Sequence, residues 1–445
     1  MKKRMKITYT KVITIGFALL ILLGTFLLML PISSRSREWT SFTNALFTST
    51  SATCVTGLVV YDTFSYWSIF GQLTLITLIQ IGGLGFMTII TMFSFLLKRR
   101  IGLRERRLLM ESAGSTELRG VLRMIRKILY GTFITEAVGA LLLSVRFVPK
   151  MGLLRGIYNA VFHSVSAFCN AGFDLMGRYE PFSSLTLFYD DIYVNLIICG
   201  LIIIGGVGFI VWNDIFNFRH NVHKYSLHSK IVLVTTGVLL LVGTVLFYVF
   251  ERDGVLASMP EHKRWLVSFF QSVTSRTAGF NTADLSGISH STLVIFCILM
   301  FIGGSPGSTA GGVKTTTFAI LVFSAVASAR RSNYITVFKK RLEEKTARQA
   351  SAVVVTYVLA LAAAIMVMCA VEPFSLTSIV FEAVSAMGTV GVTMGITSEL
   401  SVVSRYIVII LMYAGRIGGL TLMLTLAEKR KQVAVKRPAE QVLIG

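Results

Sequence analysis

Four short segments that share a glycine recur along this 445-residue chain, and their residue types suit the binding of a cation by backbone oxygens. The glycines are Gly57, Gly172, Gly279 and Gly391, and about a quarter of the chain separates each from the next. Glycine has no Cβ and tolerates positive φ, so an extended chain can turn its carbonyl groups toward one axis. Rings of carbonyls replace the hydration shell of an ion in cation filters. The repeated glycines therefore predict a carbonyl-lined selectivity filter.

A short amphipathic stretch precedes each glycine segment. These stretches are Ser41–Ser51, Arg155–Ala167, Lys263–Thr274 and Ser375–Ala386. Runs of about 10–14 residues suit re-entrant half-helices, and backbone that leaves a helix inside a membrane must be buried in protein or line a cavity. Four half-helices around one axis would direct their negative C-terminal ends at it, which favours cations. The predicted filter residues are Val55, Thr56, Gly57, Asn170, Ala171, Gly172, Thr277, Ala278, Gly279, Thr389, Val390 and Gly391.

The elements that must position these segments are transmembrane helices. The chain is 54% hydrophobic and only 15% charged, with a mean hydropathy of +0.71, whereas a soluble domain is about a quarter charged. This composition excludes a soluble enzyme. A span needs about 20 apolar residues, and eight stretches meet this requirement: Val12–Leu30, Ile69–Leu97, Ile128–Phe147, Ile192–Phe216, Ile231–Phe250, Leu293–Ser324, Ala352–Val371 and Val402–Leu426.

The predicted fold is an all-α polytopic membrane protein with four pseudo-fourfold repeats of helix, re-entrant pore helix, filter loop and helix around a central pore. The first repeat covers residues 1–97, and the second, with a cytoplasmic loop, covers residues 98–218. The third covers residues 219–328, the fourth, again with a cytoplasmic loop, covers residues 329–427, and a C-terminal tail covers residues 428–445.

The basic residues set the predicted orientation. The chain has 43 Lys and Arg residues against 22 Asp and Glu residues, a net charge of +21. Thirty of the basic residues fall on one face of the predicted topology, ten on the other and three at membrane depth. The positive-inside tendency makes the richer face cytoplasmic, with both termini on that side. The charge excess is thus a topology signal, and a nucleic-acid partner loses its support.

A glycine-rich segment interrupts the sixth predicted span. Residues Gly303–Gly312 include five glycines and Pro306 within an apolar run, and helix cannot persist there, since Gly costs about 1 and Pro about 3 kcal/mol relative to Ala. We expect a polar intramembrane loop that faces a cavity; the alternative is a passive kink. Glycine pairs also occur at equivalent positions of the other second spans, and for all these pairs, Gly303-Gly304 included, we favour close helix packing.

Three cations at membrane depth require partners. We expect Arg416 to contact the glycine-rich segment, the alternative being a structural pair with a carboxylate. Lys314 either holds that segment or extends toward the membrane surface, and the residues do not decide between the two. Arg276 is expected behind the filter, where it donates to loop carbonyls or pairs with a carboxylate such as Glu382. Glu136 is interpreted as a structural partner in preference to a site for a coupling ion.

The four repeats and their glycine loops resemble the Trk/Ktr/HKT superfamily of cation transporters over nearly the whole chain, and in particular the membrane subunits of bacterial Ktr potassium-uptake systems. Thr389-Val390-Gly391 is similar to the Thr-Val-Gly of potassium-channel filters, and the other loops are degenerate copies. The resemblance implies potassium selectivity, because all four loops carry glycine, with potassium at the carbonyls of the filter residues. It also implies a gate formed by Gly303, Gly304, Ser305, Pro306, Gly307, Ser308, Thr309, Ala310, Gly311, Gly312, Arg416 and Lys314.

The resemblance further implies a homodimer in the cell membrane, with a cytosolic nucleotide-binding regulatory ring (KtrA-like) on the basic cytoplasmic face, especially Lys98–Lys127 and Arg330–Arg348. Transport would be driven by the electrochemical gradient, and a dependence on sodium is left open. No organic cofactor and no catalytic residue is expected.

Three alternatives remain for the function. A sodium-permeable or sodium/potassium-coupled transporter could have the same fold. A secondary transporter of a small organic solute is disfavoured, because such transporters usually show twofold inverted repeats. A membrane enzyme is disfavoured because His163 and His290 are isolated and no paired acids or metal motif occurs within a span.

Overall fold

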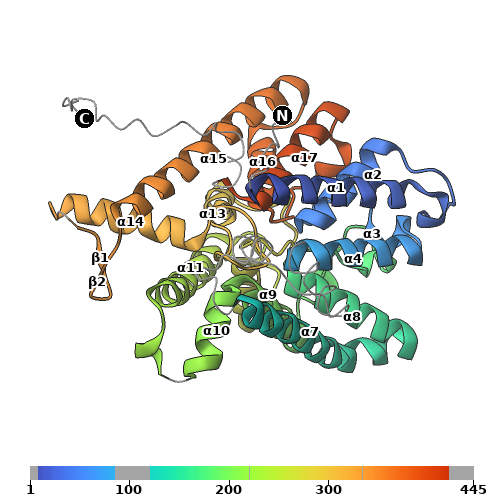
Figure 1. The fold of residues 1–445 in the computed structure, drawn as a ribbon. Helices are drawn as coiled ribbons and strands as arrows, with labels where there is room; N and C mark the ends of the chain where they lie inside the picture. The colour runs from blue at the N-terminus through green and yellow to red at the C-terminus, as the bar shows by residue number, and fades with distance from the viewer. Residues whose placement is uncertain (1–8, 86–120, 220, 333, 420–445) are drawn as a thin grey trace, which may run out of the picture.

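The computed structural model describes residues 9–85, 121–219, 221–332 and 334–419, and the fold is helical. Its helices are α1 (Tyr9–Met29), α2 (Phe42–Cys54), α3 (Thr63–Tyr66), α4 (Ile69–Leu84), α7 (Val121–Met151), α8 (Leu153–Cys169), α9 (Ile192–Val207), α10 (Phe209–Phe218), α11 (Leu227–Glu251), α12 (Glu261–Thr274), α13 (His290–Phe301), α14 (Thr315–Ala329), α15 (Glu344–Val371), α16 (Leu376–Gly388) and α17 (Val402–Ile417). Short 3-10 turns are η1 (Pro31–Ser33), η2 (Met176–Arg178), η3 (Thr186–Phe188), η4 (Val222–Lys224) and η5 (Thr397–Glu399). Figure 1 shows these elements grouped in chain order around the middle of the molecule.

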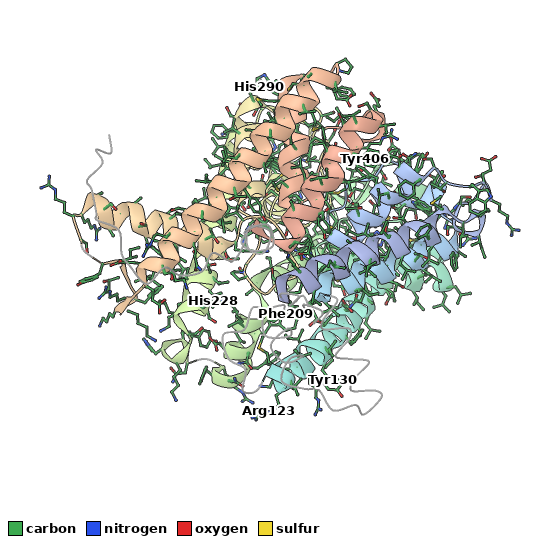
Figure 2. All side chains as sticks on the ribbon, turned by 45° about the horizontal axis from the view of Figure 1, so that its top comes forward. Arg123, Tyr130, Phe209, His228, His290 and Tyr406 are labelled. Atoms are coloured by element: carbon green, nitrogen blue, oxygen red, sulfur yellow. The ribbon has the colours of Figure 1, made fainter. Side chains whose placement is uncertain are left out.

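Four long helices are apolar enough to cross a membrane. They are Lys11–Met29 of α1, Leu122–Met151 of α7, α11 and α15, the first predicted span of each repeat. Their outward side chains are apolar: Leu141 on α7 is 70% exposed, and Tyr130 lies on the outer edge of the same helix (Figure 2). Such surfaces suit contact with lipid, since each helix satisfies its own backbone hydrogen bonds. The chain is a multi-pass membrane protein.

A short helix follows each long helix, as the sequence predicts: α8 directly after α7, α16 after a brief connection from α15, and α12 and α2 after longer connections from α11 and α1. Each of these short helices ends at or shortly before a glycine segment. Their interior faces are polar and buried: Thr48, Ser49, Thr50 and Ser51 of α2 are at most 1% exposed. Buried polar groups of this kind need hydrogen-bond partners, so the middle of the molecule is a polar interior inside an apolar exterior.

The second helix of each repeat begins with a side-chain cap. Ser68, Asp191, Ser289 and Ser401 each accept a hydrogen bond from a backbone N–H in the first turn of α4, α9, α13 and α17, respectively. Such caps satisfy donors that the helix cannot pair internally and contribute about 1 kcal/mol each. The four caps set where each second helix starts, beyond its glycine segment.

The second helices are shorter than predicted. The expected span Ile192–Phe216 is not one straight helix, because α9 ends at Val207 and α10 leaves it at an angle of 96°. Gly208 stands at the bend with φ of +100°, a conformation that side-chain-bearing residues rarely adopt. Phe209 starts α10 close to the middle of the view in Figure 2, where its backbone N–H donates to the Gly307 carbonyl oxygen at 2.8 Å.

The other second helices also end early. In the third repeat α13 ends at Phe301 and α14 begins at Thr315, which confirms the predicted break at the glycine-rich segment. Helices α4 and α17 end before Gly85 and Gly418, both with positive φ. The predicted remainders of those spans, residues 86–97 and 420–426, lie outside the described residues.

A small hairpin joins α14 to α15. Its strands β1 (Thr336–Val337) and β2 (Lys340–Arg341) pair antiparallel, and Figure 1 shows them at the left edge, away from the middle of the molecule. The turn residues Phe338 and Lys339 have positive φ, as a two-residue hairpin turn requires. The hairpin belongs to the basic segment Arg330–Arg348.

Candidate cation path

The four glycine loops, residues 55–57, 170–172, 277–279 and 389–391, share one backbone conformation. The first residue of each has positive φ: Val55 at 58°, Asn170 at 60°, Thr277 at 72° and Thr389 at 53°. The glycines also have positive φ, at 96° for Gly57, 70° for Gly172, 84° for Gly279 and 91° for Gly391. The residue between them does not. Left-handed backbone is unfavourable for residues with side chains, so its recurrence at four equivalent sites marks a conformation held by the surroundings.

Each loop is bonded to its own short helix through its N–H groups. In the first loop the N–H of Thr56 donates to the Ser51 carbonyl at 2.8 Å, and in the fourth the N–H of Val390 donates to the Ser385 carbonyl at 2.9 Å. Ala171 and Ala278 make the corresponding bonds in the other two loops. Because the N–H and C=O of one trans peptide group point in opposite directions, the carbonyl of the residue before each donor points away from the helix.

A row of hydroxyl groups completes this attachment. Ser51 and Ser385 accept from the N–H groups of Gly57 and Gly391, both at 3.1 Å. The corresponding Ser166 and Thr274 donate to the carbonyl that follows the loop glycine, both at 2.6 Å. These four residues stand at the start of the repeated segments, where their recurrence was visible in the sequence, but sequence reasoning assigned them no role.

The loops close a ring in chain order. A methyl group added to any of the four glycines would run into the carbonyl oxygen of the middle residue of the adjacent loop. The oxygen of Ala171 would be 2.6 Å from such a carbon on Gly57, and the oxygens of Ala278 and Val390 would each be 2.8 Å from one on Gly172 and Gly279. On Gly391 the methyl group would overlap the oxygen of Thr56. The structure thus brings all four predicted loops together, and glycine is required at each junction.

The carbonyls at these junctions are available to a ligand. Thr56, Ala171, Ala278 and Val390 are fully buried, and within the described residues no hydrogen-bond donor reaches their oxygens. Buried carbonyls are normally paired, so four unpaired oxygens around one ring form an environment that a dehydrated cation can occupy.

The glycine-rich segment, residues 303–312, lies against these loops. Its Ser305 and Thr309 donate from their N–H groups to the Gly206 and Gly205 carbonyls at the end of α9, at 3.0 and 3.3 Å. The hydroxyl of Thr309 also reaches the Phe168 carbonyl at 3.2 Å, directly before the second glycine loop. A methyl group on Gly311 would overlap the side chain of Thr389 in the fourth loop. The segment is therefore packed directly beneath the ring.

Comparison with known proteins identifies the family. The model described as "TrkH: Cation transport protein" matches residues 1–435. The chain belongs to the TrkH family of cation transport proteins. It is 41% identical to the potassium/sodium uptake protein NtpJ of Enterococcus hirae, covering 100% of this chain and 99% of that protein. It is 39% identical to the Ktr system potassium uptake protein B of Vibrio alginolyticus, covering 98% and 94%.

A solved structure has the same fold. The potassium transporter TrkH from Vibrio parahaemolyticus matches with a TM-score of 0.73 at 20% identity, covering 96% of this chain and 86% of that one. This likeness supports the all-α membrane architecture of the TrkH family.

Arg416 and Lys314 hold the glycine-rich segment of this TrkH-family chain. Arg416 donates from one guanidinium nitrogen to the Thr309 carbonyl and from another to the Gly82 and Gly83 carbonyls at the end of α4. It thereby links the segment to the first repeat, which confirms the predicted contact. Lys314 donates to the Ala310 and Gly311 carbonyls at 2.7 and 3.2 Å. Lys314 therefore contacts the segment, which is the first of the two alternatives that the sequence left open.

Arg276 follows one of its two predicted alternatives, donation to a carbonyl. The residue is buried, and its Nη2 donates to the Gly303 carbonyl oxygen at 3.5 Å, so the acceptor belongs to the glycine-rich segment and not to a glycine loop. Glu382, the carboxylate named as the other alternative, accepts hydrogen bonds from the hydroxyls of Thr393 and Thr397 within its own repeat.

Glu136 has a structural partner, as predicted. The side-chain amide of Gln80 on α4 donates to its two carboxyl oxygens at 2.9 and 3.2 Å. The bonds link the first long helix of the second repeat to the second helix of the first repeat.

The glycine pairs allow the expected close packing of helices. A methyl group on Gly82 would overlap a carbonyl at the end of α2, and one on Gly205 would overlap a carbonyl at the end of α8.

A carboxyl group stands just beyond the second loop. Burial raises the pKa of Asp174 to about 7, a hydrogen bond from the Met176 N–H opposes this effect, and the nearby charge of Asp62 adds to it. Asp174 is therefore partly neutral near pH 7.

Proposed function

We propose that this chain takes up potassium selectively, with the four glycine loops as its filter. The observation that carries the proposal is the closed ring of unpaired carbonyl oxygens from Thr56, Ala171, Ala278 and Val390. Two relatives above 35% identity are named as potassium uptake proteins, and a third as a potassium/sodium uptake protein. An ion would leave its hydration water at the ring, where protein oxygens replace it.

The glycine-rich segment is the proposed gate. It lies beneath the ring, and Arg416 fastens it to α4 across the path. A fixed positive charge at this position repels a potassium ion, so opening requires both the segment and the guanidinium to move aside. The membrane potential supplies about 2.3 kcal/mol per charge per 100 mV, so accumulation needs no ATP hydrolysis by this chain.

The proposed orientation places the basic face and both termini in the cytoplasm. A homodimer with a cytosolic nucleotide-binding regulatory ring would control the gate from this side. Arg330–Arg348, which includes the β1–β2 hairpin, offers exposed basic side chains for such a partner. Most of the second proposed docking region, Lys98–Lys127, and both termini lie outside the described residues.

A sodium-permeable or sodium-coupled transporter is the second candidate. The name of the Enterococcus hirae relative includes sodium, and only the fourth loop, Thr389-Val390-Gly391, has the full Thr-Val-Gly sequence. Fewer well-formed ion sites would lower discrimination between the two cations.

Flux measurements in liposomes separate the two candidates. The purified chain is reconstituted with and without a regulatory subunit, and influx of labelled rubidium as a potassium substitute is competed with potassium or sodium. Potassium should compete well and sodium poorly. Equal competition by sodium would favour the second candidate, and absence of cation flux under all conditions would refute both.

A further inference from the structure

Three of the four short helices carry, at one equivalent position, a buried side chain that accepts hydrogen bonds from the chain beyond the glycine loop. His163 and Glu382 lie nine residues before the glycine of their loops, and Gln271 lies eight residues before its own. The hydroxyl residue of the third repeat, Thr274, is likewise one residue nearer to its glycine than Ser166 and Ser385 are to theirs. The third repeat is therefore one residue shorter here, and the positions of His163, Gln271 and Glu382 correspond. All three side chains are fully buried.

Glu382 joins α16 to the chain beyond the fourth loop. Its two carboxyl oxygens accept from the hydroxyls of Thr393 at 2.7 Å and Thr397 at 2.6 Å. Both distances are those of well-formed O–H···O hydrogen bonds. Thr393 follows Gly391 by two residues, so the carboxyl group fixes the outer side of the loop, whereas Ser385 fixes its inner side.

The second and third repeats make the same connection with other side chains. Nε2 of His163 accepts from the N–H of Leu175 at 3.4 Å, beyond the second loop. With its amide oxygen turned toward the third loop, Gln271 accepts from the N–H groups of Thr282 and Ala283 at 3.3 and 3.1 Å. This amide orientation satisfies the donors and acceptors around it.

The first repeat departs from this pattern. Its residue nine before Gly57 is Thr48, whose hydroxyl donates to the Asn44 carbonyl within α2 at 2.9 Å. The chain beyond the first loop is reached only indirectly, through the Asn44 amide and the Tyr61 hydroxyl at 2.6 Å. Thr48 therefore offers a matched control position in the same molecule.

We propose that His163, Gln271 and Glu382 are positioning residues that set the cation selectivity of the second, third and fourth loops, with the largest effect at Glu382. The inference rests on the proposed function. Ring carbonyls prefer potassium only if they cannot close around the smaller sodium ion. A loop held on both its inner and outer sides resists this closure, and a loop held on one side yields to it.

The first test replaces the acceptor. Glu382→Met fills a similar volume without accepting hydrogen bonds from the threonines. Glu382→Gln retains one acceptor oxygen, and its amide N–H group can donate a hydrogen bond to a threonine hydroxyl. In reconstituted liposomes, Glu382→Met should lower the preference for potassium over sodium about tenfold, the ratio that corresponds to about 1.4 kcal/mol. Glu382→Gln should recover most of that preference, and the control Thr48→Val should leave it unchanged.

A second pair of variants approaches the same contact from the loop and leaves the short helix intact. Thr393→Val removes the hydroxyl with little change of shape, and Thr393→Ser keeps it. The valine variant should lose selectivity and the serine variant should retain it. A wild-type preference in folded Thr393→Val and Glu382→Met would overturn the proposal, and Thr393→Val alone decides the matter if Glu382→Met fails to fold.

Hydrogen–deuterium exchange keeps this test distinct from that of the proposed function. Amides of residues 392–397 should exchange faster in Glu382→Met and in Thr393→Val than in the unaltered chain, and those of residues 58–62 should not change in Thr48→Val. If the unaltered chain transports sodium as well as potassium, the proposed function fails, and the exchange data still decide whether the contact positions the loop. Unchanged exchange at residues 392–397 would overturn the positioning role.

Discussion

Replacing Gly57 with serine tests the ring of glycine loops directly. Gly57 has φ of +96°, and a Cβ at this position would lie 2.6 Å from the Ala171 carbonyl oxygen and 3.3 Å from the Gly172 Cα. Ordinary contacts between such atoms begin near about 3.4 Å. The side chain can therefore be accommodated only if the Ala171 carbonyl moves by about 0.8 Å or the first loop retreats from the second.

The size of the effect has two parts. The left-handed backbone adds about 1–2 kcal/mol of strain for any residue with a side chain. Displacing one carbonyl removes one contact with the ion. We assign this contact the binding free energy of a hydrogen bond to a charged group, about 1.5–3 kcal/mol. The serine hydroxyl can replace part of it. The net change in potassium binding is about 1.4 kcal/mol, so the preference for potassium over sodium should fall about tenfold.

The assay is competition of rubidium influx by potassium and sodium in liposomes, with Gly152→Ser as the control. Gly152 has a similar φ of +84°, but no atom lies within 4 Å of an added Cβ, so this variant introduces the strain without the clash. Gly57→Ser should admit more sodium, and Gly152→Ser should keep the selectivity of the unaltered chain. Unchanged selectivity in a folded Gly57→Ser protein would refute the role of the first loop, and an equal loss in both variants would show that strain alone is responsible.

Three further changes address the gate and the carboxyl group beyond the second loop. Arg416→Gln removes the positive charge and the link between Thr309 and Gly82, in which each charged hydrogen bond contributes about 1.5–3 kcal/mol. Rubidium flux without a partner should therefore rise at least about tenfold. A flux no higher than that of the unaltered chain would contradict the gating role. Deletion of residues 305–308 should likewise raise partner-free rubidium flux, and an inactive or unaltered protein would count against the segment as the gate. The raised pKa of Asp174 means that its contribution to stability is fully present below the ordinary carboxyl pKa of 3.8 and is lost progressively as pH rises to about 7. Asp174→Asn should flatten this loss in thermal unfolding across that pH range, and an unchanged pH profile would exclude Asp174 as its source.

The short helices and loops were predictable because each repeat preserves a local pattern. A stretch too short to span, followed by a glycine that must adopt positive φ, can be read in one chain when it recurs four times. The first long helices were predictable for the same reason, since continuous apolar runs such as that of α11 have one stable arrangement in a membrane. Helix boundaries near the middle of the molecule were less accessible, because tertiary contacts determine them.

The bend between α9 and α10 illustrates this limit. The apolar run from Ile192 to Phe216 has the length and composition of one span, and nothing local forbids a straight helix. The bend exists because the N–H of Phe209 donates to Gly307, a residue of a different repeat. Likewise, Glu382 was one of the partners expected for Arg276, but its carboxyl group accepts hydrogen bonds from Thr393 and Thr397. Partners that depend on how repeats meet cannot be read from one repeat.

The contacts of the one interrupted helix reach every repeat. The glycine-rich segment of the third repeat meets the second through Thr309, which reaches the Phe168 carbonyl, and the fourth through Gly311 at Thr389. Arg416 adds the first repeat by bonding Gly82. A change at any one of these contacts would therefore loosen the segment without removing the others, so the proposed gate is attached on all four sides of the ring.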